Sequence, residues 1–593
     1  MTDRIDTPQA SALFLSAFFD ELIVAGVRDV VVSPGSRSTP LAMVAYASDL
    51  MLYVDVDERG AAFFALGLAK ASGQPVCLIC TSGTAIANYY PAILESESSR
   101  VPLIVLTGDR PPRLQNLGAP QTCDQLKAYG DHVRHFQQMP LSAASSEDIA
   151  FARQMGKTAY LHAVGGEAAG PVHFNFPFDE PLKPDLSVAG LFEIGRGRLA
   201  IETDGDRFSR AQETCMVPPL VSAASRLSAS QVKMLAQLIK DKRTIVLAGE
   251  GSCASATEAR ELTAWAKQYG IPLLADPLSG LRNCTDPLVI DNYDNIFGKA
   301  GCPEFDAIIR FGRYPVSKKC STAIGAKRPI QIVVDPHETR DFNAATDIFV
   351  RCDPAGFIRS FGILEPTEPS VAQHASACAW IKRNEEERLR IEQVADVSAG
   401  FEGAYVAKLF ELAPEDSLVF SANSMAIRAI DTFYLKSDKH LAVLCNRGLN
   451  GIDGTVSSAF GAAQYFSQTT LLTGDLTLIH DLNALALHHE LIDHHGGEQA
   501  SSIIVVVLNN HGGAIFDMLP QQSEDSYFER LFLTPQRVDF EQAARAFGVP
   551  YRFTDSVASF TEAYGSLLGS PGVSLIEVPV LLGGLKERYG RFN

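Results

Sequence analysis

The sequence predicts an α/β protein made of three doubly wound domains with mostly parallel sheets. In the first 110 residues, apolar runs of strand length alternate with amphipathic stretches of helix length. The same rhythm returns in the C-terminal third, and two further strand-like runs lie between these regions. With 593 residues, the chain is long enough for several domains of about 150 residues each.

The composition is that of an ordinary globular protein. Hydrophobic residues make up 46% and charged residues 20%, with 45 glycines and 32 prolines, which excludes collagen-like, low-complexity and disordered classes. The formal net charge is −18 and no long Lys/Arg-rich run occurs. We therefore expect no nucleic-acid partner and no binding to an anionic membrane.

The sequence also bears on the cellular compartment. No stretch reaches the roughly 18 apolar residues of a membrane span, and Ile503–Leu508 is typical of a buried strand. Residues 1–8 include acidic side chains and lack the basic and apolar pattern of a secretory signal. The 11 cysteines do not resemble a disulfide framework, so we expect a cytoplasmic protein.

The N-terminal domain is expected over residues 1–200. A helix at about 10–25 leads into a strand at 29–33, which is followed by a Pro/Gly turn and another helix. Further buried strands are expected at 51–56, 75–80 and 101–107. Helices between successive buried strands imply a parallel sheet.

The remaining chain divides into a central domain, 201–365, and a C-terminal domain, 366–593. The central domain contains strand-like runs at 243–249 and 305–312, and residues 366–373 are a Pro-rich linker candidate. Strands of the C-terminal domain are expected at 417–421, 441–445, 470–473 and 503–508.

A short echo connects the two outer domains. Leu106–Arg110 and Leu472–Leu476 share the letters Leu-Thr-Gly-Asp at the end of an expected strand. Two related sheets would produce this echo, and so would chance.

Two expected strand ends in the C-terminal domain carry oxygen ligands. Asp475 ends one strand, and the next strand ends in the Asn-Asn-His-Gly-Gly stretch 509–513. A carboxylate and an amide oxygen can bind Mg²⁺ together with diphosphate oxygens. Gly-Asp alone is an ordinary turn, but the combination resembles the diphosphate and metal motif of thiamine-diphosphate enzymes.

These enzymes activate their cofactor with a glutamate, and Glu58 stands after a strand where a helix opens. Taken alone, it is better interpreted as a helix N-terminal carboxylate favoured by the dipole. Its neighbourhood and the C-terminal motifs resemble the 2-succinyl-5-enolpyruvyl-6-hydroxy-3-cyclohexene-1-carboxylate synthases (SEPHCHC synthases) of menaquinone biosynthesis. The resemblance rests on the stretches 32–40, 81–88, 107–113, 118–122, 421–428 and 446–454, and is weakest in the central domain.

The resemblance implies a fold with pyrimidine, central and diphosphate domains, and a transferase that uses thiamine diphosphate with Mg²⁺ or Mn²⁺. The cofactor would decarboxylate 2-oxoglutarate and add the succinyl-semialdehyde carbanion to isochorismate. Glu58 would bind the aminopyrimidine ring and act in catalysis. Ile452 would support the bent cofactor beside Ile515, and the metal ligands would be Asp475, Asn510 and the Gly512 carbonyl.

Both implied substrates are anions, so an acidic protein needs local cations to bind them. By resemblance, the substrate contacts are Arg37, Arg110, Gln121, Lys318, Ser424, Arg428, Arg447 and Phe516. Lys318 is a better candidate than Lys319, for which a surface charge is as good an interpretation. The family pairs the N-terminal domain of one chain with the C-terminal domain of another, which implies a homodimer or homotetramer.

The sequence departs from the family pattern in three places. The stretch 492–502 lengthens the interval between Asp475 and Asn510, Leu476 replaces a common glycine, and His511 replaces a frequent asparagine. A surface insertion costs little free energy, so the metal assignment is kept.

Three weaker signals point elsewhere. The histidine pairs 488–489 and 494–495 are interpreted as a polar helix end with its loop, and Cys77 and Cys80 as buried thiols. The Gly-Glu-Gly turn at 249–251 resembles half a dinucleotide fingerprint. The alternatives are therefore another thiamine-diphosphate carboligase, a dinucleotide-dependent oxidoreductase and a non-enzymatic cofactor-binding relic.

Overall fold

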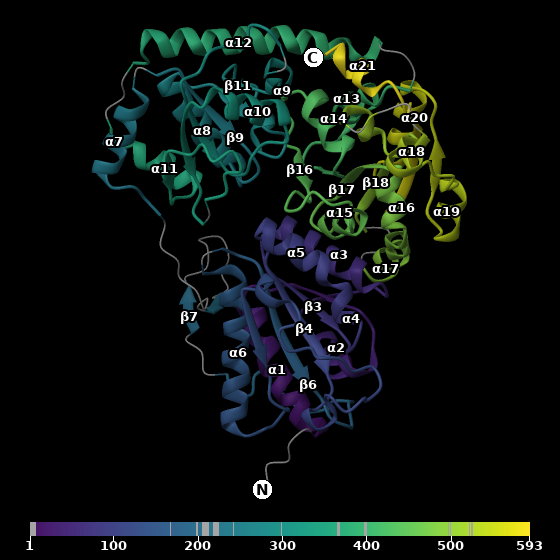
Figure 1. The fold of residues 1–593 in the computed structure, drawn as a ribbon. Coiled ribbons are helices and arrows are strands. Elements are labelled where there is room, and N and C mark those ends of the chain that lie inside the picture. Colours follow the sequence, from purple (N-terminus) through teal and green to yellow (C-terminus); the bar gives the residue numbers. More distant parts are fainter. Residues whose placement is uncertain are drawn as a thin grey trace. The chain divides into compact units, whose positions relative to one another are not determined.

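The computed structural model contains two compact units (Figure 1). Unit 1 comprises residues 1–222, 446–465 and 481–495, and unit 2 comprises 223–445, 466–480 and 496–593. The structure describes residues 7–592 except 167, 197–199, 204–212, 217–224, 241, 298, 338, 365–367, 397–399, 496, 498–499, 521 and 523–525. The expected boundary at 365–366 and part of the 492–502 stretch therefore lie outside the described residues.

Unit 1 contains a six-stranded parallel sheet in the order β2-β1-β3-β4-β6-β5. Its strands are β1 (Asp29–Val32), β2 (Met51–Val54), β3 (Val76–Cys80), β4 (Leu103–Asp109), β5 (His135–Gln138) and β6 (Pro171–Pro177). The expected strands near 29, 51, 75 and 101 are confirmed. An antiparallel pair, β7 (Ala200–Thr203) and β8 (Glu213–Met216), follows.

Helices cover both faces of this sheet, and two segments from the C-terminal third join them. They are α1 (Pro8–Ala25), α2 (Thr39–Tyr46), α3 (Glu58–Ser72), α4 (Ala85–Asn88), α5 (Tyr90–Ser99), α6 (Ser146–Val164), α15 (Thr455–Ala463) and α17 (Leu487–His494). Helices α3 and α15 lie against each other at glycines. A Cβ atom on Gly67 would lie 1.9 Å from the Ser458 carbonyl oxygen.

Helix α1 is a core helix of unit 1. Thr7 caps its N-terminus and Gly26, at φ 116°, ends it. By length and composition it is the one helix among the described residues that is apolar enough to cross a membrane, yet 72% of that window is buried inside the protein. Its acidic residues Asp20 and Glu21 pair with Arg153 of α6 at 2.7 and 2.9 Å, which ties α1 to α6.

Unit 2 contains two further six-stranded parallel sheets. The middle sheet has the order β11-β10-β9-β12-β13-β14, which is the 3-2-1-4-5-6 order of the Rossmann fold. Its strands are β9 (Thr244–Ala248), β10 (Leu273–Ala275), β11 (Val289–Ile290), β12 (Ala307–Phe311), β13 (Ile330–Val334) and β14 (Ile348–Val350). Both strands expected in this region are confirmed.

The C-terminal sheet has the order β16-β15-β17-β18-β20-β19. Its strands are β15 (Leu418–Ser421), β16 (Ala442–Cys445), β17 (Gln468–Gly474), β18 (Ser502–Asn509), β19 (Tyr551–Phe553) and β20 (Gly572–Pro579). Numbered within each sheet, this order is identical to that of unit 1, so the two outer sheets share one topology. The Leu-Thr-Gly-Asp echo, however, lies on the fourth strand of one sheet and the third of the other, so it does not mark equivalent positions.

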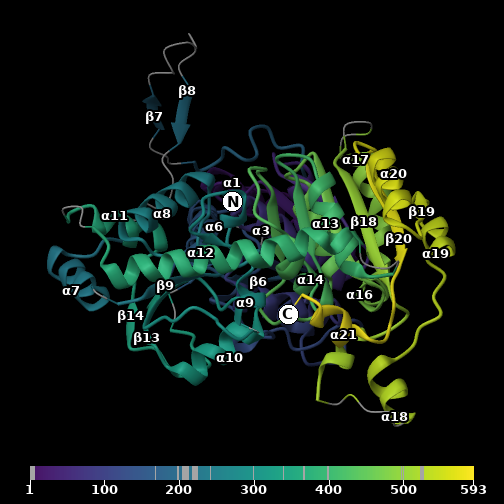
Figure 2. The ribbon, with the colours of Figure 1, turned by 90° about the horizontal axis from the view of Figure 1, so that it is seen from above.

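The helices of unit 2 pack on these two sheets. They are α7 (Ala229–Ile239), α8 (Ala256–Tyr269), α9 (Tyr293–Phe297), α10 (Lys318–Lys327), α11 (Pro354–Phe361), α12 (Val371–Glu392), α13 (Glu402–Leu412), α14 (Met425–Phe433), α16 (Asp475–His480), α18 (Ser526–Phe528), α19 (Phe540–Ala546), α20 (Val557–Leu567) and α21 (Leu585–Gly590). The long helix α12 runs past α9 and the middle sheet in Figure 2, and its buried Trp380 packs among Ile245, Leu274 and Phe305.

Candidate active site

Asp475 lies at the carboxyl edge of the C-terminal sheet, directly after β17. In the pairing of β17 with β18, Gly474 lies opposite Leu508, so residues 509–513 follow at the neighbouring strand end. Asp475 is 2% exposed, and its Oδ2 atom has no hydrogen-bond partner among the residues that the structure describes. Burial raises the pKa of this carboxyl group to about 6, against the opposing backbone N–H of Leu476. A cation bound at this site would therefore compensate the charge of the buried carboxylate.

The turn after β18 is fixed by its own side chains. The backbone N–H of His511 donates to Asn509 Oδ1, and that of Gly512 donates to Asn510 Oδ1, both at 2.9 Å. Gly512 must be glycine, because a Cβ atom there would lie 2.3 Å from the Leu533 carbonyl oxygen. The orphaned carboxylate oxygen and the neighbouring amide and carbonyl oxygens fit a hard divalent cation such as Mg²⁺.

Glu58 is the first residue of α3, at the carboxyl edge of the sheet in unit 1. The preceding Asp57 caps the helix by accepting from the backbone N–H groups of Arg59 and Gly60. Glu58 therefore does not serve as the cap, and its Oε2 accepts a hydrogen bond from Asn88 Nδ2 at 3.3 Å. The turn before it contains Asp55, whose pKa is raised to about 7 by burial.

The polar residues expected near Glu58 follow other strands of the same sheet. Arg37 is 7% exposed and donates to the Phe178 carbonyl oxygen at 2.9 Å and to Glu180 Oε1 at 3.2 Å. Burial, and secondarily the nearby Arg110, lower the pKa of Arg37. Arg110 follows β4, and its guanidinium donates to the Pro120 carbonyl oxygen at 2.7 Å.

Gln121 belongs to the same edge of unit 1. Its Nε2 atom donates to the Ser82 carbonyl oxygen at 3.2 Å, and Ser82 Oγ donates back to the Gln121 carbonyl oxygen at 2.8 Å. Gln121 has φ 53°, an uncommon value for a residue other than glycine. This reciprocal pair joins the loop after β3 to the loop that contains Gln121.

Arg447 and Ile452 follow β16 in the segment that belongs to unit 1. Glu95 of α5 accepts hydrogen bonds from the backbone N–H groups of Gly448 and Leu449, both at 2.7 Å. Farther along this segment, the Ile452 carbonyl oxygen accepts from Thr455 Oγ1 at 3.2 Å. These bonds hold the whole 447–455 segment against α5 and at the start of α15.

In the middle sheet, the chain's own loops fill the place where a Rossmann fold binds a dinucleotide. That place is the switch point between β9 and β12, where the strand order reverses. A Cβ atom on Gly249 would lie 1.8 Å from the Arg313 carbonyl oxygen, and one on Gly312 would lie 2.1 Å from that of Glu250. The glycines thus serve contact between two loops, which argues against the dinucleotide alternative.

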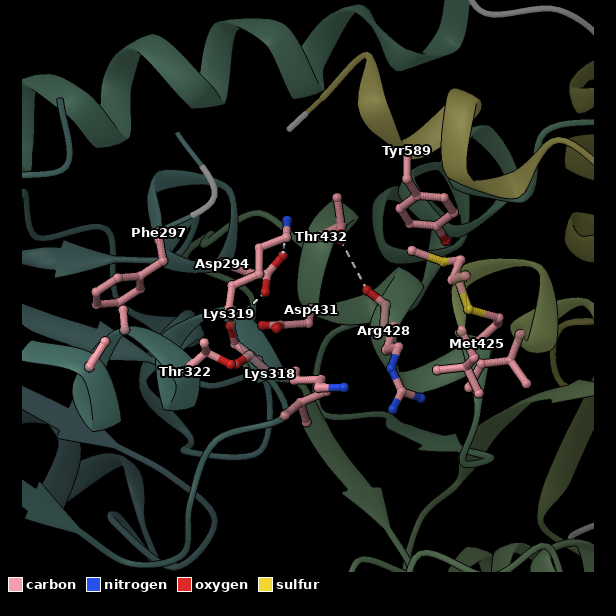
Figure 3. Close-up of a pocket in the computed structure, with 17 residues that line it drawn as sticks. Asp294, Phe297, Lys318, Lys319, Thr322, Met425, Arg428, Asp431, Thr432 and Tyr589 are labelled. Carbon is pink, nitrogen blue, oxygen red and sulfur yellow. Dashed lines mark hydrogen bonds and ion pairs between the residues drawn. The ribbon is translucent and has the colours of Figure 1, made fainter. Parts of the chain in front are cut away.

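The loop that closes this switch point leads into a cavity of about 570 Å³ in unit 2. Elements α9, α10, α14, the short helix η8 (Ala514–Met518) and α21 contribute its lining (Figure 3). Lys318, Arg428 and Ile515 all line it. In Figure 3 the Lys318 amine and the Arg428 guanidinium extend toward the same space, whereas Lys319 turns to Asp294.

Asp431, which lines this cavity, belongs to a buried ion pair. Asp431 Oδ1 accepts from Arg282 Nη2 at 2.7 Å, and Arg282 also donates to the carbonyl oxygens of Ala275 and Tyr434. Burial raises the pKa of Asp431, and Arg282 opposes that rise. Ser424, at the start of α14, has φ 65°. Its carbonyl oxygen accepts a hydrogen bond from Arg428 Nη1 at 2.5 Å.

Two family models match the chain around these strand ends. One is described as "Thiamine pyrophosphate enzyme, N-terminal TPP binding domain" and matches residues 14–128, which include Glu58. The other is described as "Thiamine pyrophosphate enzyme, C-terminal TPP binding domain" and matches residues 431–578, which include Asp475 and Asn510.

Curated relatives extend the match to nearly the whole chain. The 2-succinyl-5-enolpyruvyl-6-hydroxy-3-cyclohexene-1-carboxylate synthase of Listeria monocytogenes is 39% identical over 577 residues, covering 95% of this chain and 94% of that protein. The chain belongs to the SEPHCHC synthase family. The synthase of Geobacillus thermodenitrificans is 40% identical over 579 residues, covering 96% and 93% of the two chains. That of Bacillus velezensis is 38% identical over 579 residues, covering 95% and 94%.

The fold of this SEPHCHC synthase family member also occurs in a solved structure. Benzoylformate decarboxylase from Polynucleobacter necessarius matches with a TM-score of 0.66 and 17% identity, covering 96% of this chain and 98% of that chain. At this identity the likeness concerns the fold alone. The predicted fold class is confirmed, because the chain contains three doubly wound, six-stranded parallel sheets.

The expected site residues of this chain fall into two groups. Unit 1 contains Glu58, Arg37, Arg110, Gln121, Arg447 and Ile452, whereas unit 2 contains Asp475, Asn510, Gly512, Lys318, Ser424, Arg428, Ile515 and Phe516. Phe516 packs on Phe532, with ring centroids 5.4 Å apart, and is absent from the described lining of the cavity. Its role in the pocket wall stays a prediction.

Sequence reasoning missed the partners that hold these residues. Asn88, which donates to Glu58, ends the quoted stretch 81–88 but was given no role there. Asp276 and Asp294, which bind the loop before Lys318, lie in the central domain where the resemblance was weakest. No sequence signal marks them, because their partners are distant along the chain.

The residues behind the weaker signals have ordinary structural roles. Cys77 and Cys80 are buried in β3, where burial raises the pKa of both thiols. His495 stacks on Tyr53, with ring centroids 4.1 Å apart, and its Nε2 lies 3.4 Å from Glu490. No group of three or more His, Cys, Asp or Glu side chains forms a metal site within the described part of the chain.

Proposed function

We propose that this protein is a thiamine-diphosphate-dependent transferase that converts 2-oxoglutarate and isochorismate into 2-succinyl-5-enolpyruvyl-6-hydroxy-3-cyclohexene-1-carboxylate and CO₂. Membership of the SEPHCHC synthase family supports this reaction. The observation in the structure that carries it is the buried Asp475 Oδ2 atom at the strand end beside Asn510 and Gly512, which has no partner within the described part of the chain. When bound, thiamine diphosphate supplies a nucleophilic carbon and an electron sink for decarboxylation.

Asp475, Asn510 and the Gly512 carbonyl are the proposed ligands of Mg²⁺, with Mn²⁺ as an alternative. Their support is the donor set itself, since carboxylate, amide and carbonyl oxygens suit a hard cation. The metal would hold the diphosphate, while Ile452 and Ile515 would contact the rest of the cofactor. The Asn510 amide oxygen accepts from the Gly512 N–H in this state, so the turn is preformed.

Glu58 is the proposed catalytic residue. The cap by Asp57 leaves the Glu58 carboxylate free of the helix N–H groups, and Asn88 orients one of its oxygens. A carboxylate held in this way can share a proton with a ring nitrogen of the cofactor. Its expected contribution is therefore proton transfer at the aminopyrimidine ring.

Cations in both units are the proposed partners of the substrate carboxylates. Arg37, Arg110 and Arg447 belong to unit 1, and Lys318 and Arg428 face the cavity in unit 2. Gln121 and Ser424 would add polar contacts, with Phe516 near the apolar side. The apolar lining by residues such as Met425 and Ile515 suits a pocket that excludes water.

The site would be completed between two chains. By family resemblance, the N-terminal domain of one copy meets the C-terminal domain of another, so we propose a homodimer or homotetramer in the cytoplasm. The division of the expected site residues between the two units is compatible with this arrangement. We propose no nucleic-acid or membrane partner.

An omission assay tests the proposed function. The purified protein is mixed with Mg²⁺, thiamine diphosphate, 2-oxoglutarate and isochorismate, and the loss of isochorismate absorbance is followed as each component is omitted in turn. The proposal expects loss only in the complete mixture. Release of CO₂ with isochorismate intact would instead indicate a thiamine-diphosphate carboligase with another acceptor, and no reaction in a folded, cofactor-loaded protein would overturn the proposal.

A further inference from the structure

Two consecutive lysines open helix α10, but their surroundings differ. Lys319 Nζ lies 3.0 Å from Asp294 Oδ2. Lys318 is exposed, and its amine forms no hydrogen bond or ion pair with any residue that the structure describes. Both line the cavity of Figure 3, yet only Lys318 presents an unengaged ammonium group to it.

The loop before Lys318 is attached at three points, to the loops that follow β9 and β10 and to α9. The Arg313 N–H donates to the Glu250 carbonyl oxygen at 3.0 Å, which closes the switch point. The Val316 N–H donates to Asp276 Oδ2 at 2.7 Å. Ser317 Oγ donates to Asp294 Oδ1 at 2.5 Å, so the third attachment is made by the same carboxylate that binds Lys319.

Ser317 also determines where α10 begins. Its Oγ accepts from the Cys320 N–H at 3.0 Å, which makes it the N-cap of the helix. One oxygen of Asp294 therefore orients the capping hydroxyl of Ser317, and the other binds the amine of Lys319. Because Lys318 is the first residue after this cap, its direction depends on both contacts.

We propose that Asp294 is a positioning residue: it engages Lys319 and Ser317 so that Lys318 is the ammonium group that receives the substrate carboxylate. The identity of that substrate rests on the proposed function. Both carboxylate oxygens of Asp294 are engaged by Ser317 and Lys319. We therefore expect it to act on the Michaelis constant of the substrate that Lys318 receives and not on the chemical step. Its role is selection between two neighbouring cations of the same chemistry.

Amine labelling tests the selection without any need for turnover. The full-length protein is treated with a limiting amine-reactive reagent, and labelling of each lysine is quantified by mass spectrometry. In the wild type, Lys318 should be labelled several-fold more than Lys319, and one of the two anionic substrates, 2-oxoglutarate or isochorismate, should protect Lys318. In Asp294→Asn and Asp294→Ala, labelling of Lys319 should rise to the level of Lys318.

Kinetics supply the second readout. Asp294→Ala, which removes both contacts, should raise KM about fivefold for the substrate that protects Lys318, with kcat within about twofold of wild type. Asp294→Asn should give a smaller rise, because an amide oxygen can still accept from Ser317. Lys319→Met should leave KM near the wild-type value, because it removes the competing ammonium group and leaves Lys318 to receive the substrate. Added to Asp294→Asn, it should bring KM back toward wild type, because the two residues act in one interaction.

A matched control lies at the other end of the same helix. Lys327, the last residue of α10, pairs with the exposed Glu304, and Glu304→Gln should change neither KM nor Lys318 labelling. Unchanged Lys319 labelling and unchanged KM in folded Asp294→Ala would overturn the positioning role. If instead the wild type fails to turn over 2-oxoglutarate while the labelling pattern holds, the proposed function falls and the selection by Asp294 stands.

Discussion

At the residue scale, two neighbouring acidic residues at the start of α3 have different roles. Asp57 satisfies the helix N–H groups, and Glu58 is held at one oxygen by Asn88. This division matters because a carboxylate that caps a helix loses the freedom to exchange a proton elsewhere. Asp475 in unit 2 has the opposite character, since it is buried with one oxygen unpaired.

Glu58→Gln should retain cofactor binding but lower kcat by about 100-fold or more, because an amide cannot exchange the proton. Isothermal titration would measure cofactor binding, and the omission assay would measure kcat. Glu147→Gln, which removes a first-turn carboxylate from α6, is the matched control and should leave both unchanged. Activity of Glu58→Gln within a few-fold of wild type would refute the catalytic role.

Asp475→Asn should affect the cofactor-free and the loaded protein in opposite directions. Without ligands, the variant should be as stable as the wild type or more stable, because the amide removes an uncompensated buried charge. With Mg²⁺ and thiamine diphosphate at about 100 times Kd, the wild type should gain roughly 2.7 kcal/mol, and the variant should gain little. Thermal shifts with and without chelator would measure this, and an equal gain in both proteins would contradict the metal assignment.

At the scale of elements, glycine contacts and one buried arginine organise the packing. Gly67 and Gly461 allow α3 and α15 to approach within backbone contact, because a Cβ on Gly461 would lie 2.0 Å from the Phe64 carbonyl oxygen. In unit 2, Arg282 is 1% exposed and joins the edge of the middle sheet to α14 through Asp431 and Tyr434.

Gly67→Ala should destabilise the protein by about 1–3 kcal/mol, since the helices must separate to admit a methyl group. Gly565 lies inside α20 with no atom within 4 Å of an added Cβ. Gly565→Ala should therefore have the opposite effect and stabilise the protein by about 0.5–1 kcal/mol. Thermal unfolding of both variants checks the contrast, which would fail if both shifted the midpoint downward.

Arg282→Met should destabilise unit 2 by about 3–5 kcal/mol, because it leaves Asp431 buried without its cation. Arg359 pairs with Glu261 at the surface, with side chains 47% and 35% exposed, so Arg359→Met should cost about 0–1 kcal/mol. Denaturant unfolding of the two variants would measure the difference. Equal losses would show that the buried pair does not hold the middle sheet to α14.

The strands that the sequence predicts are those with mostly apolar runs. Strand β6 escaped prediction because it contains His173 and Asn175, which are buried but bonded to Thr107 of β4 at 2.8 and 2.7 Å. Strand β11 has two residues, too few for a pattern. The site residues were predicted where they follow strands in family motifs, whereas Asp294 and Asn88 gain their roles only through contacts that folding creates.

At the scale of the whole molecule, two sheets of identical strand order carry the two halves of the expected site. Glu58 lies at the carboxyl edge of one sheet, and Asp475 lies at the carboxyl edge of the other. The middle sheet has the Rossmann order, but loops close its switch point and lead into the helix that presents Lys318.

Complementation between two inactive variants tests whether each site is shared by two chains. When Glu58→Gln and Asp475→Asn chains are mixed in a dimer, one of the two shared sites has both native residues. Random pairing should therefore restore about a quarter of wild-type activity. Activity no higher than that of either variant alone, in a verified mixed dimer, would place each site within one chain.

The most direct measurement is the stoichiometry of the complete reaction. 2-Oxoglutarate labelled with ¹³C at its C1 carboxylate is incubated with isochorismate, Mg²⁺, thiamine diphosphate and the protein, and labelled CO₂ and product are quantified together by mass spectrometry. The proposed function predicts one labelled CO₂ for each isochorismate consumed, and an unlabelled product that contains the remaining four carbons of 2-oxoglutarate. Retention of the label in the product, or consumption of isochorismate without CO₂, would contradict it.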